Sequence, residues 1–136
     1  MSWDDYVKSM VGPDCQDAAI YGQNPPCVWA CHPGGIFSKI TPVQIQELLS
    51  ADRNPLFING VCLGTQKCSL IRDALHSPDS YMMDLRTKAA EGPTFNIAIC
   101  KTNSALIFAM GAEGVYGGAI HTKTHDVGKY LRDQNC

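Results

Sequence analysis

The sequence has no apolar run that approaches 18 residues, no stripe of basic side chains and no low-complexity tract. We therefore expect no membrane-spanning helix. A formal net charge of −2 without a basic stripe also argues against a nucleic-acid partner. The first residues, Met1–Asp5, are acidic and aromatic, unlike a signal peptide. No repeat or linker divides the chain, so its 136 residues are expected to form one domain, 1–136.

Cysteine is not scarce, but its distribution does not suggest a disulfide framework. The seven cysteines are odd in number and lie at positions 15, 27, 31, 62, 68, 100 and 136. Several fall inside apolar, strand-like runs, where a free cysteine behaves as a small core residue. We expect a reduced protein of the cytoplasm.

The last part of the chain shows the strongest pattern. Ala105–Met110 is an apolar run without alternation, which suits a central strand buried on both faces. Four glycines follow within residues 111–118 and exclude a long regular element there. Apolar or small side chains then recur at 4-3-4 spacing, which predicts an amphipathic helix that covers the strand, with one stripe formed by Ile120, Thr124, Val127 and Leu131.

The rest of the chain predicts short elements. Ser2 is a suitable N-cap for a first helix that Gly12 and Pro13 end, and Thr41 precedes Pro42 at the start of a second helix. Residues 52–55 read as a loop. We predict strands over residues 17–21, 27–31, 57–63 with a bend or hairpin at Asn59-Gly60, 67–75, 83–88 and 94–99. In the last two, apolar and polar residues alternate, which indicates one core face and one wet face.

These elements indicate an α+β domain. The expected architecture is a central antiparallel β-sheet with the N- and C-terminal helices packed together on one face and a shorter helix on the other.

Ten short motifs occur in order along the whole chain. They are Ser2-Trp3-x-x-Tyr6-Val7, Gln16-Asp17-Ala18-Ala19-Ile20, Val28-Trp29-Ala30, Ile40-Thr41-Pro42, Asn59-Gly60-x-x-Leu63-Gly64, Gln66 to Asp73, Met83 to Lys88, Pro93-Thr94-Phe95-Asn96, Met110-Gly111-x-Glu113-Gly114-Val115-x-Gly117-Gly118 and Lys129 to Arg132. Together they resemble the profilin family, in its animal form. The resemblance implies a protein that binds monomeric actin and regulates its polymerisation, binds proline-rich segments such as those of formin-like proteins, and binds acidic phosphoinositides. It implies no catalysis and no cofactor.

A polyproline II ligand suits flat aromatic faces with a few donors, because it has no internal hydrogen bonds and keeps its carbonyls free. Trp and Tyr can stack on proline rings while donating from N–H or O–H groups. The resemblance places one such groove between the terminal helices, formed by Trp3, Tyr6, Trp29, Tyr130 and Leu131. As isolated residues these would be core aromatics, but Trp3 near the N-terminus is difficult to bury, so we favour the groove.

The resemblance also implies an actin-facing set on the sheet and the last helix. Its members are Ile58, Lys67, Ser69, Ile71, Arg72, Arg86, Lys88, Thr94, Asn96, Val115, Gly118, His121, Thr122, His125 and Asp126. Strand parity agrees in part, because Lys67 and Ser69 share a face, as do Arg86 and Lys88. Without the family, these would be ordinary solvated strand faces. Arg72 and Arg86 are also the candidates for contact with phosphoinositide headgroups.

The sequence departs from the family pattern at several positions. Cys136 stands where an aromatic residue is common, and Ala112, His121, Thr122, His125 and Asp126 replace residues that are usual near the actin-facing edge. A proline-motif adaptor with weak or lost actin binding is therefore the alternative function. A metal protein is a weaker rival, suggested by the His121–His125 spacing and by Cys27-x-x-x-Cys31-His32, but no third ligand is evident near the histidine pair and the cysteine spacing is wrong for a tight knuckle.

Overall fold

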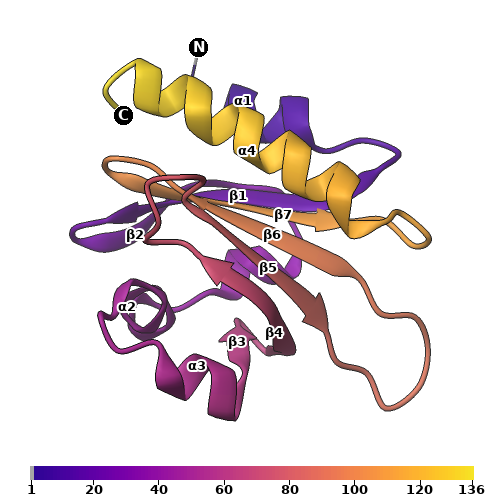
Figure 1. Ribbon diagram of the computed structural model, residues 1–136. Coiled ribbons are helices and arrows are strands. Elements are labelled where there is room, and N and C mark those ends of the chain that lie inside the picture. The colour runs from indigo at the N-terminus through magenta and orange to yellow at the C-terminus, as the bar shows by residue number, and fades with distance from the viewer. Residues whose placement is uncertain (1) are drawn as a thin grey trace.

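The computed structural model describes residues 2–136, which form one seven-stranded antiparallel sheet with helices on both faces (Figure 1). The strand order is β2-β1-β7-β6-β5-β4-β3. The elements are α1 (Trp3–Met10), β1 (Cys15–Gln23), β2 (Pro26–Cys31), the 3-10 helix η1 (Ile36–Lys39), α2 (Pro42–Leu49), α3 (Asn54–Asn59), β3 (Val61–Leu63), β4 (Gln66–Ala74), β5 (Met82–Thr87), β6 (Asn96–Lys101), β7 (Ala105–Gly111) and α4 (Gly117–Asp133). The predicted α+β class is confirmed.

The two terminal helices lie side by side on one face of the sheet (Figure 1). Val7 and Met10 of α1 and Ile120 and Leu131 of α4 enter the same apolar cluster. The Nζ of Lys123 on α4 also donates to the main-chain oxygen of Met10 at 2.8 Å. The predicted pairing of the N- and C-terminal helices is thus confirmed.

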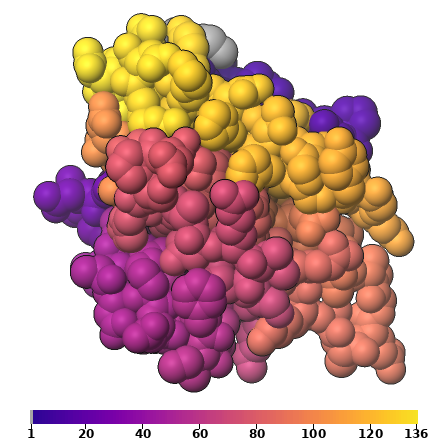
Figure 2. All heavy atoms as spheres, in the orientation of Figure 1, coloured from indigo at the N-terminus to yellow at the C-terminus, as the bar shows by residue number. Residues whose placement is uncertain are grey.

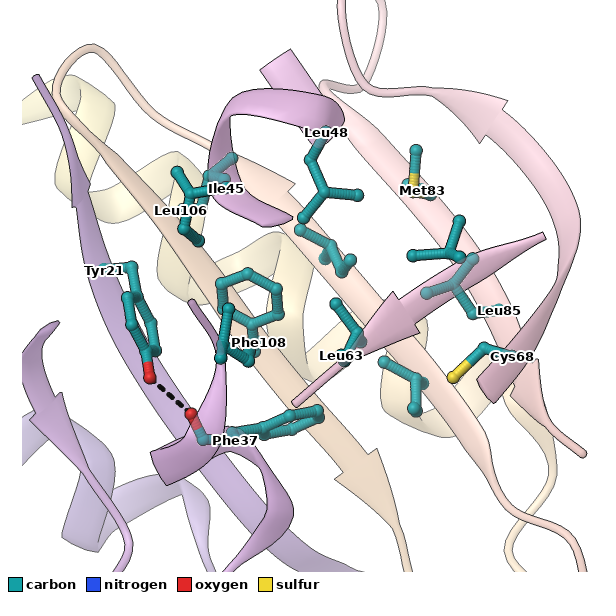
Figure 3. Close-up of a cluster of buried hydrophobic side chains, with 14 of the residues drawn as sticks. Tyr21, Phe37, Ile45, Leu48, Leu63, Cys68, Met83, Leu85, Leu106 and Phe108 are labelled. Carbon is teal, nitrogen blue, oxygen red and sulfur yellow. Dashed lines mark hydrogen bonds between the residues drawn. The ribbon is translucent and has the colours of Figure 1, made fainter. Parts of the chain in front are cut away.

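The opposite face is covered by η1, α2 and the start of α3. Its core contains Phe108 of β7, with Tyr21 edge-on to it and Phe37 tilted against it, both at centroid distances of 5.6 Å (Figure 3). The hydroxyl of Tyr21 donates to the carbonyl of Phe37 at 2.5 Å, so this polar group is satisfied within the core. Burial and then the nearby Cys31 thiol raise the pKa of Tyr21 to about 12.

Strand β7 lies between β1 and β6 and is buried along its whole length, as its uninterrupted apolar run predicts. Helix α4 follows β7 directly and covers both β6 and β7. The expected alternation of buried and exposed side chains therefore fails on β6. Ala98, which the sequence places on the wet face, is fully buried under α4, and so is Cys100 two residues on. The stripe on α4 is nearly as predicted, except that Gly128 is buried in the place expected for Val127.

One predicted element is wrong. Residues 54–59 form the helix α3, and the strand β3 begins only at Val61. Phe57 and Ile58 are exposed on this helix, whereas Leu56 is buried. Gly60 ends it with φ +79°, a conformation that favours glycine, and an added Cβ there would lie 2.7 Å from the carbonyl oxygen of Cys68. Asn59-Gly60 is therefore the end of a helix, rather than the bend of a hairpin.

No helix among residues 2–136 has the length and apolar character needed to cross a bilayer. The seven cysteines are all free thiols.

Candidate functional site

Four aromatic side chains predicted for the proline groove form one row. The ring of Trp3 lies 4.8 Å from Trp29 and 5.9 Å from Tyr6, measured between centroids, and Tyr6 lies 6.2 Å from Tyr130. The row therefore runs from β2 across α1 to α4, three elements distant in sequence. All four rings keep some contact with solvent, and Tyr130 is 51% exposed. The structure brings these predicted residues together.

Helix α1 presents Trp3 and Tyr6 because its start is fixed. Ser2 is the N-cap, its hydroxyl accepts from the main-chain N–H of Asp5, and the Asp5 carboxylate accepts from the N–H of Ser2. This capping box satisfies helix-terminal donors and sets the orientation of the first turn, where the two aromatics lie three positions apart. The hydrogen bond that the Ser2 N–H donates to the Asp5 carboxylate is the largest cause that lowers the pKa of this carboxyl.

Trp29 reaches the row because β2 is irregular. Tyr21 pairs with Val28 and Ile20 with Ala30, so Trp29 is an extra residue without a partner on β1. Such a bulge turns a side chain away from strict alternation. Both Trp29 and its neighbour Ala30 accordingly pack on the side of the terminal helices.

Leu131 lies behind the row. It is only 2% exposed and belongs to the apolar cluster under α4, so it can support the groove but offers little surface to a ligand. Cys136 packs against the same cluster, and its main-chain oxygen accepts from the N–H of Ser104 at 2.7 Å. Burial, and then the neighbouring Tyr130, raise the pKa of the Tyr6 phenol, which therefore remains a hydrogen-bond donor at neutral pH.

A second surface forms where β4, β5 and β6 meet the start of α4. Figure 2 shows the pink to salmon residues of β4 and β5 bordering the yellow-orange residues of α4 on one side of the molecule. Here a cleft of about 360 Å³ is lined by Ile71, Arg72, Asp84, Leu85, Asn96, Ile97, Gly117, Gly118 and His121. Five of these nine residues belong to the predicted actin-facing set.

Hydrogen bonds join several more members of that set beside the cleft. Arg86 donates from Nε to Thr94 Oγ1 at 2.9 Å and from a terminal nitrogen to Asn96 Oδ1 at 3.0 Å. Asn96 in turn donates from Nδ2 to the main-chain oxygen of Val115 at 3.2 Å. The loop before α4 is thereby fixed against the start of β6, and this part of the surface is preformed.

Arg72 faces the cleft because of another bulge. Leu70 pairs with Leu85 and Arg72 with Asp84, so Ile71 is the extra residue on β4. Strict alternation would place Arg72 on the same side as Cys68 and Leu70, which pack into the core. The bulge instead lets adjacent Ile71 and Arg72 both line the cleft, with Ile71 62% exposed.

His121 and His125 are one turn apart on α4, and their rings are nearly parallel, 6° apart in plane and 6.3 Å between centroids. Nδ1 of His121 lies 2.8 Å from Oδ1 of Asp84. Asp84 is a residue that the sequence-based set omits, although it is predicted on the same wet strand face as Arg86. A carboxylate therefore faces the histidine at the rim of the cleft.

The remaining members of the predicted actin-facing set lie outside the cleft and its hydrogen-bonded border. Lys67 and Lys88 line a shallow hollow with Thr65, Gln66, Ala89 and Ala90, and the N–H of Lys88 donates to the carbonyl of Lys67. Ile58 lies on α3 and is 79% exposed. Thr122 and Asp126 are exposed on α4. Tyr116, the exposed N-cap residue of α4, is a further surface aromatic that the sequence did not single out.

Within residues 2–136, no group of three or more His, Cys, Asp or Glu side chains is arranged to hold a metal ion. The stacked His121–His125 pair has only Asp84 and the more distant Asp126 as acidic neighbours, the latter at 3.8 Å from His125.

Comparison with known proteins gives a consistent result. The family model described as Profilin matches residues 1–136. Human Profilin-1 is 44% identical over 133 residues, which cover 96% of this chain and 95% of that protein, and human Profilin-2 is 43% identical over 134 residues, with 96% of each covered.

Solved structures agree. Mouse profilin IIa, in complex with a double repeat from the FH1 domain of mDia1, superposes with a TM-score of 0.96 at 42% identity and full coverage of both chains. Profilin IA of Acanthamoeba castellanii is only 22% identical but shares the fold, with a TM-score of 0.76 over 99% of this chain and 100% of that one.

Proposed function

The chain belongs to the profilin family, and from this membership we propose that it binds monomeric actin, regulates actin polymerisation and binds proline-rich segments. FH1 repeats of formin-like proteins are the kind of segment we expect, since a similar profilin has been solved with one. The function is one of binding rather than catalysis, and it would be exercised in the cytoplasm, in association with the actin cytoskeleton.

The observation that supports proline binding most directly is the aromatic row Trp29–Trp3–Tyr6–Tyr130. Its three centroid spacings give a path of about 17 Å. A polyproline II chain rises about 3.1 Å per residue, so the row matches roughly five to six residues of ligand. Every ring is anchored by its neighbours before binding, which limits the ordering cost.

Removal of one ring from inside the row, Trp3, and of one from its end, Tyr130, tests this site. Trp3→Ala and Tyr130→Ala should each weaken binding of a fluorescent proline-rich peptide by about 2 kcal/mol or more, the scale of a buried aromatic anchor, as measured by anisotropy. Both positions lie at the surface ends of helices, so circular dichroism should show an intact fold.

Tyr116→Ala is the matched control. It removes the same side chain as Tyr130→Ala from the other end of α4, where the ring is 73% exposed and distant from the row. Its peptide affinity should equal that of the wild type. Folded Trp3→Ala and Tyr130→Ala proteins that retain wild-type affinity would show that the groove lies elsewhere.

We propose that actin docks on the second surface. The supporting feature is the cleft lined by Ile71, Arg72 and His121, with Arg86, Thr94, Asn96 and Val115 joined beside it. An exposed aliphatic residue beside an arginine in a concave site is a suitable anchor for a protein partner. Lys67, Ser69, Lys88, Gly118, Thr122, His125, Asp126 and Ile58 would extend the contact.

Phosphoinositide headgroups would meet the same surface. Arg72 is exposed at the cleft, whereas the guanidinium of Arg86 is already engaged by Thr94 and Asn96. We therefore propose Arg72 as the main contact and Arg86 as the minor one. If the wild-type protein binds a proline-rich peptide but does not bind monomeric actin, the alternative function, a proline-motif adaptor, is favoured instead.

A further inference from the structure

Trp29 lies directly against a glycine on the neighbouring strand. Gly22 of β1 is buried, and a Cβ added to it would lie 2.5 Å from Nε1, 2.7 Å from Cε2 and 3.0 Å from Cζ2 of the Trp29 indole. Real Cβ atoms do not approach other atoms this closely, so any side chain at position 22 requires a displacement. Gly22 does not have positive φ, so the backbone conformation does not require glycine at this position. What the glycine provides is room for the indole.

The backbone at position 22 is held too firmly to supply that displacement. Gly22 pairs with Cys27 on β2 and with Ala105 on β7. The next residue, Gln23, is fixed by three hydrogen bonds: its N–H donates to Ser104 O at 3.0 Å, and its Nε2 donates to Thr102 O at 2.8 Å and to Ala105 O at 2.9 Å. The indole would have to move instead.

The indole has little freedom to move without leaving the row. It packs against the apolar cluster under the terminal helices, and the Trp3 ring lies beside it at a centroid distance of 4.8 Å. The bulge at Trp29 brings the ring to this side of the sheet, and Gly22 leaves the room in which it sits. A displaced Trp29 would alter the distance and tilt between the two tryptophans.

We propose that Gly22 is a positioning residue of the proline groove, which acts through Trp29. The absence of a side chain at position 22 sets the place of the Trp29 ring beside Trp3 and so shapes one end of the binding row. Its effect on ligand affinity rests on the proposed function, whereas its effect on the tryptophan pair does not.

Gly22→Ala tests the proposal through three measurements. Affinity for a proline-rich peptide should fall at least tenfold, while affinity for monomeric actin stays at the wild-type value. The far-ultraviolet circular dichroism couplet expected from two indoles 4.8 Å apart should shrink, because exciton coupling depends on their separation and angle. A purely structural role elsewhere in the sheet would leave that couplet unchanged.

Gly12→Ala is the matched control. Position 12 lies in the turn between α1 and β1, does not have positive φ, and an added Cβ there meets nothing closer than 4.0 Å. The same chemical change should leave peptide affinity and the couplet as in the wild type.

A double-mutant comparison shows whether position 22 acts through the ring. In a Trp29→Ala protein the indole is gone, so Gly22→Ala should lower the denaturant midpoint far less than it does in the wild type. An equal loss of midpoint in both backgrounds would overturn the proposal. So would a Gly22→Ala protein with an unchanged couplet. If Trp3→Ala retains peptide binding, but Gly22→Ala shrinks the couplet and lowers the midpoint mainly in the presence of Trp29, the groove assignment fails while Gly22 still positions Trp29.

Discussion

At the scale of single residues, Arg53, the residue that precedes α3, joins this helix to two other elements through its guanidinium group. It donates to the carbonyl of Leu48 at the end of α2 and, from Nε and a terminal nitrogen, to both carboxylate oxygens of Asp73 on β4 at 2.7 and 3.0 Å. Asp73 follows directly after the Ile71–Arg72 bulge. The Arg53–Asp73 pair therefore holds β4 in place directly after the two residues that line the cleft.

Burial alone would raise the pKa of Asp73, but hydrogen bonds from Arg53 and from the N–H of Leu75 outweigh it, so the pKa lies below its ordinary value of 3.8. A carboxyl group whose pKa is depressed by folding stabilises the protein above its unfolded pKa, and that stabilisation is lost as the pH falls through the folded pKa.

Asp73→Asn should therefore lower the free energy of unfolding near pH 7 by roughly 2 kcal/mol, the scale of a charged hydrogen-bonded pair that loses one charge. The difference from the wild type should narrow as the pH falls below about 4, because the wild-type carboxyl is then progressively protonated. Urea titrations at pH 7, 4 and 3 measure this. A difference that does not depend on pH would contradict an ionised Asp73 in the folded state.

At the scale of elements, the helices α1 and α2 begin with the same capping motif but present different side chains. The hydroxyls of Ser2 and Thr41 each accept from the N–H three residues on, and the side-chain oxygens of Asp5 and Gln44 each accept from the N–H of the cap residue. Of these two helices, α1 alone carries residues of the aromatic row. Comparing the loss of the cap in α1 with its loss in α2 therefore separates an effect on the aromatic row from the general loss of stability.

Ser2→Ala and Thr41→Ala should each destabilise the protein by about 1 kcal/mol, as measured by urea unfolding. Because a frayed first turn misplaces Trp3, only Ser2→Ala should also weaken binding of a proline-rich peptide. Equal peptide affinity in the two variants would mean that α1 is held in place by its packing on the sheet and not by its cap.

Elements with a clear signal in the sequence were predicted correctly. The unbroken apolar run Ala105–Met110 indicated a strand buried on both faces, and Thr41-Pro42 marked the first turn of α2. The helix α3 was missed because it has only six residues, too few for a helical period to appear, and no side-chain cap at Arg53. Its exposed Phe57 and Ile58 looked like part of a strand.

The candidate site was predictable as a set of residues and unpredictable in its geometry. Family motifs supplied Trp3, Trp29 and Arg72, and the structure brings each to one of the two surfaces. The two bulges that turn Trp29 and Arg72 toward those surfaces depend on the pairing of neighbouring strands, which local sequence does not encode. Asp84 was missed for the same reason, since its partner His121 is 37 residues away.

At the scale of the whole molecule, α4 connects the two proposed sites. His121 lies near its start at the cleft and Tyr130 lies near its end in the aromatic row. They are nine positions apart in the helix, a rise of about 14 Å at 1.5 Å per residue. The two proposed surfaces share no residue, so both partners should be accommodated at once.

Simultaneous binding is the measurement that tests this account most directly. A fluorescent proline-rich peptide is first saturated with the protein, and monomeric actin is then added while anisotropy is followed. The peptide should stay bound and its anisotropy should rise further, as a ternary complex tumbles more slowly. With Arg72→Glu, which reverses a charge at the cleft, the peptide should bind as before but actin should cause a much smaller rise. Release of the peptide by actin in the wild type would contradict the existence of two separate sites.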